Sequence, residues 1–236
     1  MNIFDLTLLI RNHLSDDECQ SLINEYERKH INASKEQSYH AYENKVAASS
    51  FKRIEVVESS PQYELIKSKT EQALTQWLDH LDSKQLFSIS TLRSVLRYPY
   101  NFRILKYEPG NYIHPHTDWD HSNYASVTLN LNDSYTGGEF SFMNGKHVIK
   151  LEKGDALIFP ADHFWVHEVY PVITGIRYSV NTFISSIHKS ERNMLNNAIY
   201  RSQQKHNPVF KPRKIYIIKI LLHMVLRLNG VTLTVV

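Results

Sequence analysis

The stretch from residue 102 to residue 184 consists of short apolar segments separated by turn-forming residues. The segments are rich in β-branched and aromatic residues, and each has the length of a strand. Asn144-Gly145 is the clearest turn, because both positions accept the positive φ angles that a tight hairpin requires. Eight short strands at near-regular spacing predict an antiparallel sandwich or jelly roll and argue against a parallel Rossmann sheet. The predicted strands are 102–107, 113–116, 125–131, 138–143, 147–151, 156–159, 165–170 and 176–184.

Two helical patterns precede these strands. Ser15 and Glu18 bracket the sequence S-D-D-E, a capping box, which predicts a helix from there to about Glu27. A longer amphipathic helix is predicted over 61–81, where apolar residues recur every three or four positions. We expect both helices to cover one side of the predicted β structure.

The other N-terminal segments carry weaker patterns. Residues 29–50 are polar and predict a surface loop, and Lys52–Val57 is predicted to be a strand. We therefore expect one α+β domain, mainly β, in which residues 1–100 support a core at 101–190. A basic, apolar and helical tail at 191–236 follows.

Cysteine use and the beginning of the chain favour an intracellular protein. Cys19 is the single cysteine, so the chain can form neither an intramolecular disulfide nor a zinc site built from cysteines. The N-terminal residues lack the basic start, unbroken apolar run and cleavage site of a secretory signal. No segment is long and apolar enough to span a bilayer securely. We expect a cytoplasmic location.

The net charge of +3 hides an uneven distribution. From Arg192 onward there are eight basic residues and no acidic one, which leaves 19 basic and 24 acidic residues before it, a net charge of −5. Within the tail, 211–236 contains an apolar helical pattern with a basic stripe. Two interpretations stay open: peripheral contact with a membrane or partner, or packing on the chain's own body or in a dimer. Dispersed charges without aromatic residues argue against a nucleic-acid partner.

One short motif and one distant histidine suggest a metal site. In His116-Thr-Asp118 an extended backbone aims the imidazole and the carboxylate to the same face. His167 lies in a later predicted strand. Two histidines and one carboxylate on one face of a metal ion, with positions left open, form the facial triad of non-haem Fe(II) oxygenases.

Arg177 adds a second feature to this metal motif. If the turn signals at 171–175 close a hairpin centred near residue 172, His167 and Arg177 become cross-strand neighbours. A guanidinium beside the metal can bind one carboxylate of a dicarboxylate through two hydrogen bonds, while the other end of the dicarboxylate chelates the iron.

These residues resemble a known family, the 2-oxoglutarate- and Fe(II)-dependent dioxygenases, in particular the prolyl 4-hydroxylase-like branch. The resemblance rests on three segments in the family's order and spacing: LKYEPGNYIHPHTD at 105–118, LNDSYTGGEFSF at 131–142 and KGDALIFPADHFWVHEVYPVITGIRYSVNTFI at 153–184. It implies the double-stranded β-helix, a jelly roll, as the fold of the catalytic core. It also implies Fe(II), 2-oxoglutarate and O₂ as the reacting partners of an enzyme, with ascorbate as a candidate cofactor.

The resemblance carries over to individual positions of this sequence. The implied Fe(II) ligands are His116, Asp118 and His167. Arg177 would hold the distal carboxylate of 2-oxoglutarate, where the family's prolyl hydroxylases usually have lysine. Ser179 and Tyr107 match positions that often assist this arginine or lysine in binding 2-oxoglutarate.

The same comparison bears on the outcome of the reaction. Asp118 favours hydroxylation, because halogenating relatives lack this carboxylate. Phe183 stands where prolyl hydroxylases tend to have tryptophan, which weakens the case for a peptidyl proline.

Several residues near the motif have competing interpretations. Histidines at 114, 121, 147 and 163 lie in the same window, and we expect none of them to be a ligand. Trp119, Tyr124 and Trp165 are candidates for a substrate channel or for ordinary packing.

The expected function is hydroxylation of an unactivated C–H bond in a peptide or small molecule, with a peptidyl proline as one candidate. The alternatives are an oxygenase for a free metabolite and a metal-binding jelly-roll module without turnover. Oligomeric state stays open.

Overall fold

The computed structural model describes residues 2–43, 45–85, 88–120 and 122–206. The chain divides into two units, one ending at Lys189 and one beginning at Ser190, which are described separately.

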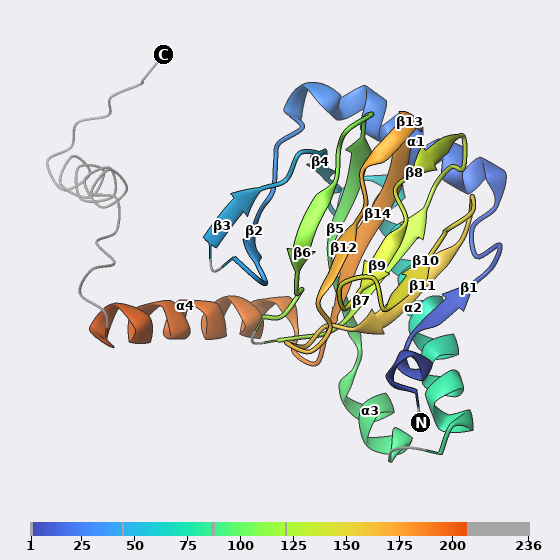
Figure 1. Ribbon diagram of the computed structural model, residues 1–236. Coiled ribbons are helices and arrows are strands. Elements are labelled where there is room, and N and C mark those ends of the chain that lie inside the picture. The colour runs from blue at the N-terminus through green and yellow to red at the C-terminus, as the bar shows by residue number, and fades with distance from the viewer. Residues whose placement is uncertain (1, 44, 86–87, 121, 207–236) are drawn as a thin grey trace, which may run out of the picture. The chain divides into compact units, whose positions relative to one another are not determined.

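A six-stranded antiparallel sheet is the largest element of the first unit (Figure 1). Its central strands are long, and their side chains are buried almost throughout, because both faces of the sheet are covered. Its strands, in spatial order, are β1 (Leu8–Ile10), β11 (Ala156–Pro160), β7 (Asn123–Asn130), β14 (Arg177–Ser185), β5 (Tyr98–Tyr107) and β4 (Lys52–Glu55).

A four-stranded antiparallel sheet forms the second layer (Figure 1). In spatial order it contains β10 (His147–Ile149), β9 (Phe140–Phe142), β12 (His167–Val169) and β6 (Ile113–His116). Aromatic and aliphatic side chains from both sheets, among them Leu105, Phe142 and Phe159, form one buried cluster. The predicted jelly roll is confirmed.

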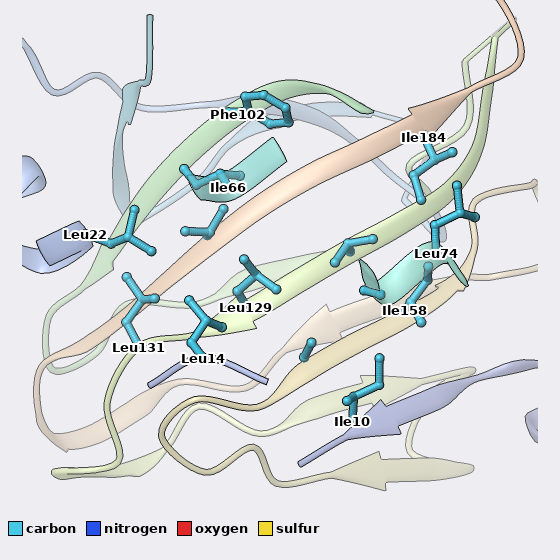
Figure 2. Close-up of a cluster of buried hydrophobic side chains, with 14 of the residues drawn as sticks. Ile10, Leu14, Leu22, Ile66, Leu74, Phe102, Leu129, Leu131, Ile158 and Ile184 are labelled. Carbon is cyan, nitrogen blue, oxygen red and sulfur yellow. The ribbon is translucent and has the colours of Figure 1, made fainter. Parts of the chain in front are cut away.

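Helices cover the opposite face of the large sheet. They are α1 (Asp16–Lys29), α2 (Pro61–Ser83) and the short α3 (Ile89–Val95). Alternate strand residues such as Leu129 and Ile158 point toward them and pack with Leu22 and Ile66 in a second buried cluster (Figure 2). Both predicted helices are confirmed.

The capping box that starts α1 is formed as predicted. The Ser15 hydroxyl accepts from the Glu18 backbone N–H at 3.2 Å, and the Glu18 carboxylate accepts from the Ser15 N–H at 2.7 Å. These bonds satisfy N–H groups at the helix start that have no partner within the helix.

The prediction of a surface loop at 29–50 was wrong. A 3₁₀ turn at His30–Asn32 is followed by a hairpin of β2 (Gln37–His40) and β3 (Lys45–Ala48). Its side chains are exposed or half-buried, so the alternation of apolar and polar residues that identifies a strand in sequence is missing.

A second small sheet joins β8 (Tyr135–Gly137) to β13 (Val172–Gly175). The predicted strand 138–143 therefore begins later, as β9, because Gly137 and Gly138 both adopt positive φ and separate it from β8. Residues 172–175, predicted to be a turn, form a strand. The remaining predicted strands are present, with boundaries shifted by a few residues.

Helix α4 (Lys189–His206) is the described element of the second unit. The predicted docking segment 211–236 lies outside the described residues. None of the helices in the described part of the chain combines the length and the apolarity needed to cross a bilayer.

Candidate active site

The two metal-motif histidines are direct cross-strand neighbours. His116 ends β6, His167 begins β12, and the register pairs them. Their ring centroids lie 4.3 Å apart. Asp118 follows two residues after His116, and its carboxylate oxygens lie 3.5 Å from His116 Nε2 and 3.3 Å from His167 Nε2. One potential ligand atom from each residue lies within 4.8 Å of the others, so the three side chains form one buried cluster.

Backbone carbonyls fix which nitrogen each histidine presents. Nδ1 of His116 lies 2.9 Å from the carbonyl oxygen of His114, and Nδ1 of His167 lies 2.9 Å from that of Trp165. A carbonyl oxygen can only accept, so both Nδ1 atoms carry the proton, and both Nε2 atoms face the Asp118 carboxylate. This is the orienting hydrogen bond typical of metal-binding histidines.

Side chains of strand β7 hold Asp118 in place. Its Oδ2 accepts a hydrogen bond from the Ser126 hydroxyl at 2.7 Å, and its backbone carbonyl accepts from the Asn123 side chain at 2.7 Å. The Asp120 carboxylate accepts from the backbone N–H groups of Ser122 and Asn123 and so closes the turn.

The electrostatics of this cluster favour a bound cation. Burial alone would raise the pKa of Asp118, but His167 and His116 hold it well below its usual range. Burial alone would lower the pKa of His116, but the Asp118 carboxylate raises it. A carboxylate kept ionised beside two oriented imidazoles in a buried site is a donor set suited to a divalent transition metal.

Aromatic rings pack around His167. Phe140 stacks on its imidazole at 5.4 Å with an interplanar angle of 13°, and Phe159 meets it edge-on at 4.8 Å. In a low-dielectric pocket the attraction between charged groups is stronger than in water.

His116, Asp118 and His167 line a hollow between the two sheets, and Arg177 lines it as well. The Arg177 side chain is buried, with 1% of the residue exposed. Its Nη1 donates to the Ser179 hydroxyl at 3.2 Å, and its Cζ lies 5.1 Å from the ring centroid of its cross-strand partner Tyr107. Among the described residues neither Nε nor Nη2 has a hydrogen-bond partner. These two donors form one edge of the guanidinium. That edge can donate two parallel hydrogen bonds to one carboxylate.

The predicted hairpin between His167 and Arg177 does not exist. His167 pairs with β6 and β9 in the small sheet, and Arg177 pairs with β5 in the large one. Between them, β13 pairs with β8, and the close approach of these backbones requires glycine. A Cβ on Gly137 would lie 2.3 Å from the Pro171 carbonyl oxygen, and one on Gly175 would lie 2.3 Å from that of Ser134. The two residues meet across the hollow from opposite sheets.

Other histidines of the window have separate contacts. His114 Nε2 lies 2.9 Å from the Ser38 hydroxyl, and its ring stacks on His40. His147 stacks on Phe4, and His163 stacks on Trp119. The described residues form a potential metal-binding group from His116, Asp118 and His167. That group includes neither His114, His147 nor His163. His121 lies outside the described residues.

The three aromatic channel candidates do not line the hollow. Trp165 is buried against Phe4 and Phe142, which is the packing alternative. Trp119 and Tyr124 are 41% and 49% exposed.

The hollow contains residues that the sequence analysis missed. Glu36, Arg103 and Asn181 line it together with Phe51 and Thr128. Asn181 could have been found by counting two residues on from Ser179 along the strand, and Arg103 by counting back from Tyr107. Glu36 comes from a segment without a strand pattern, so the sequence held no signal for it.

A family model described as the 2OG-Fe(II) oxygenase superfamily matches residues 102–185. That stretch contains the three clustered residues and Arg177. Over these residues the chain is similar to the 2OG-Fe(II) oxygenase superfamily.

Curated proteins with similar sequences are PKHD-type hydroxylases. One from Cupriavidus pinatubonensis is 36% identical over 101 residues, which cover 39% of this chain and 43% of the relative. One from Xylella fastidiosa is 33% identical over 103 residues, which cover 39% and 44%. The chain thus matches less than half the length of these curated relatives.

Solved structures share the fold over a larger part of the chain. A viral collagen prolyl hydroxylase from Paramecium Bursaria Chlorella virus-1, in its 2OG complex, superposes with a TM-score of 0.54 at 20% identity and covers 77% of this chain and 97% of that one. A prolyl hydroxylase from Trichoplax adhaerens, in complex with a hypoxia inducible factor peptide fragment, gives 0.57 at 18% identity, covering 80% and 87%.

The residues of the site could bind both Fe(II) and 2-oxoglutarate. The ionised Asp118 and the two Nε2 lone pairs fit a divalent iron. The unpartnered edge of Arg177 fits a carboxylate of 2-oxoglutarate.

Proposed function

We propose that this protein is a 2-oxoglutarate- and Fe(II)-dependent dioxygenase that hydroxylates an unactivated C–H bond. The observation that carries the proposal is one hollow that contains both an oriented His116–Asp118–His167 cluster and the open guanidinium edge of Arg177.

Each residue has a defined task in this proposal. His116, Asp118 and His167 would hold Fe(II), and Arg177 with Ser179 would hold the distal carboxylate of 2-oxoglutarate. Bound iron supplies the activation of O₂, which couples conversion of 2-oxoglutarate to succinate and CO₂ with hydroxylation of the substrate. The protein supplies orientation and a site from which bulk water is excluded.

Tyr107 positions Arg177 rather than reacting. Its ring is buried beneath the guanidinium, and burial raises the pKa of its hydroxyl. A phenol that stays neutral can contact the carboxylate of 2-oxoglutarate without adding a negative charge beside it.

A peptide is the substrate class that the solved neighbours suggest. One is a collagen prolyl hydroxylase, and another was captured with a hypoxia inducible factor peptide fragment. Phe183 stands where tryptophan is usual in prolyl hydroxylases, so a free metabolite remains the second candidate. Both are C–H hydroxylations by the same site.

The test measures turnover and product mass together. The full chain is incubated with Fe(II), 2-oxoglutarate, O₂ and ascorbate. Succinate is then quantified with and without a library of proline-containing peptides and free amino acids. We expect slow succinate formation without substrate, faster formation with the true substrate, and a product heavier by one oxygen atom.

The Asp118→Ala variant is the control for adventitious iron chemistry, since it removes a proposed ligand. Bound metal without succinate from either protein would contradict the proposal and favour a jelly-roll module without turnover.

We further propose a cytoplasmic location with peripheral contact through 211–236. The eight basic residues from Arg192 onward and the apolar pattern of that segment support contact with an anionic membrane. Flotation with anionic liposomes should be lost when 211–236 are deleted, and equal flotation of both forms would contradict it.

A further inference from the structure

A second buried arginine lines the same hollow. Arg103 on β5 is 4% exposed. Its Nη1 donates to the Glu36 carboxylate, and its Nη2 donates to the Asn181 side-chain oxygen. Its Nε is buried and has no hydrogen-bond partner among the described residues. The superfamily resemblance assigns no task to this arginine.

Strand register separates the two arginines. Tyr107 is opposite Arg177, and Arg103 is opposite Asn181, four residues further along both strands. At the rise of an extended chain this separates the two pairs by about 13 Å. Arg177 is tethered to Ser179, whereas Arg103 is tethered to Glu36 and Asn181. A five-carbon dicarboxylate held by Arg177 therefore leaves Arg103 available for another ligand.

The Arg103 guanidinium is fixed in place before any ligand binds. Its Cζ lies 4.9 Å from the ring centroid of Phe183. The backbone of Glu36 is tied to Ser49 by two hydrogen bonds, from Glu36 N–H to Ser49 Oγ at 3.0 Å and from Ser49 N–H to the Glu36 carbonyl at 2.7 Å. A donor held in this way loses little side-chain entropy when a ligand binds.

The charge balance at this end of the hollow leaves Arg103 with a carboxylate partner that it shares with another arginine. Arg53 also approaches Glu36, with Nε 3.7 Å from Oε2, so two guanidiniums share one half-buried carboxylate. Arg53 has a second partner in Glu55, whose side chain is 54% exposed. Bound Fe(II) and the 2-oxoglutarate dianion cancel one another in charge and leave this balance unchanged.

An unpaired donor on a buried cation is costly, because the lost hydrogen bond to water is not replaced. We propose that Arg103 recognises a carboxylate of the primary substrate and that the substrate is therefore an anionic molecule or segment. This inference rests on the proposed oxygenase function. Asn181 and Glu36 position the guanidinium, and its Nε donates to the substrate carboxylate.

The test uses matched acids and amides as probes of the holoenzyme. The full chain is loaded anaerobically with Fe(II) and saturating 2-oxoglutarate, which occupies the cluster and Arg177. N-acetylvaline and its primary amide then probe a main-chain carboxylate. The α-amide of N-acetylglutamate and that of N-acetylglutamine probe a side-chain carboxylate. The readout is the saturable change that each probe causes in the metal-to-ligand absorption band.

We expect at least one acid to bind about tenfold more tightly than its amide, as a charge-assisted hydrogen bond implies. In Arg103→Gln this preference should fall to near one, and in Arg103→Lys it should be partly retained. Arg93→Gln is the matched control, because Arg93 pairs with Asp79 between α3 and α2, and it should keep the full preference.

Since Arg103→Gln leaves Glu36 with one fewer partner, the double variant Glu36→Gln/Arg103→Gln tests the same point with both charges removed. A wild-type holoenzyme that responds to no acid, or equally to acids and amides, would overturn the assignment. So would a preference that survives in the variants while 2-oxoglutarate affinity falls, because Arg103 would then serve the co-substrate. A missing absorption band in the wild type would instead overturn the proposed function itself.

Discussion

Arg177 and Tyr107 face each other across strands β14 and β5, with the guanidinium carbon 5.1 Å from the centre of the phenol ring. The ring limits where the arginine can point, and Ser179 Oγ accepts from its Nη1. The edge formed by Nε and Nη2 is left without a partner in the described part of the chain. The positions of these two residues in the register thus define the proposed co-substrate pocket.

Replacing Arg177 should abolish most 2-oxoglutarate binding while leaving the metal site intact. Arg177→Gln removes a charge-assisted fork and should raise the Kd of 2-oxoglutarate roughly 100-fold. Arg177→Lys keeps the charge but not the fork, so its effect should be smaller. Isothermal titration with the metal-loaded protein measures both, and an unchanged Kd in Arg177→Gln would contradict the assignment.

Tyr107 should matter mainly through its ring. Tyr107→Phe keeps the surface under Arg177 and should weaken 2-oxoglutarate binding less than tenfold, as loss of about one neutral hydrogen bond implies. Tyr107→Ala removes a buried aromatic side chain and should lower the free energy of unfolding by about 3–5 kcal/mol. Urea unfolding and 2-oxoglutarate titration separate the effects. A Phe variant as impaired as Arg177→Gln would show that the hydroxyl dominates.

Two glycines with similar positive φ angles should respond differently to alanine. Gly110 has φ +84°, and no described atom lies within 4 Å of the place that an alanine methyl group would take there. Gly110→Ala should therefore cost about 1 kcal/mol from backbone strain alone. Gly137 has φ +74°, and its methyl group would lie 2.3 Å from the Pro171 carbonyl oxygen.

Gly137→Ala should therefore cost about 3 kcal/mol or more, because the β8–β13 backbones must separate. Chemical denaturation of the two variants measures the difference. Equal destabilisation of the two variants would mean that the close approach of β8 and β13 adds nothing to the cost of alanine at Gly137.

Cys19 should be inert in the folded protein. It is fully buried, and burial raises the pKa of its thiol to about 11. At about pH 8 a thiol reagent should react slowly with the native chain and fully with the denatured one. Fast reaction of the native protein would contradict the burial.

The same thiol makes stability depend on alkaline pH. A raised folded-state pKa stabilises the fold below the ordinary thiol pKa of 9.0, and this contribution is lost as pH rises toward about 11. Cys19→Ala should show a flatter decline in unfolding free energy over that range, and identical slopes would contradict this origin.

The sequence indicated the residues that meet at the proposed site better than it indicated their neighbours in the hollow. His116 and Asp118 are two residues apart on one chain segment, so local geometry alone brings them together. That His167 lies beside His116 could not be derived from spacing, because it depends on how two distant strands pair. The resemblance to a family supplied that information instead.

The mistaken turn at 171–175 has a specific physical origin. Pro171 and Gly175 are turn-forming residues in sequence, yet the segment between them is a strand that pairs with β8. Glycine at 137 and 175 serves close backbone contact there, which a turn signal cannot distinguish from a bend. The polar hairpin at β2 and β3 was missed for a related reason, since neither strand has a buried face to impose alternation.

Anaerobic titration of Fe(II) in the presence of 2-oxoglutarate tests the central claim most directly, with His116→Ala and His114→Ala compared to the wild type. The His114 backbone carbonyl accepts from His116 Nδ1, and alanine preserves that carbonyl. We expect a metal-to-ligand absorption band at one iron per chain in the wild type and in His114→Ala, and no band in His116→Ala. A band that persists in His116→Ala, or that is absent from the wild type, would contradict the assignment of His116, Asp118 and His167 as the iron site.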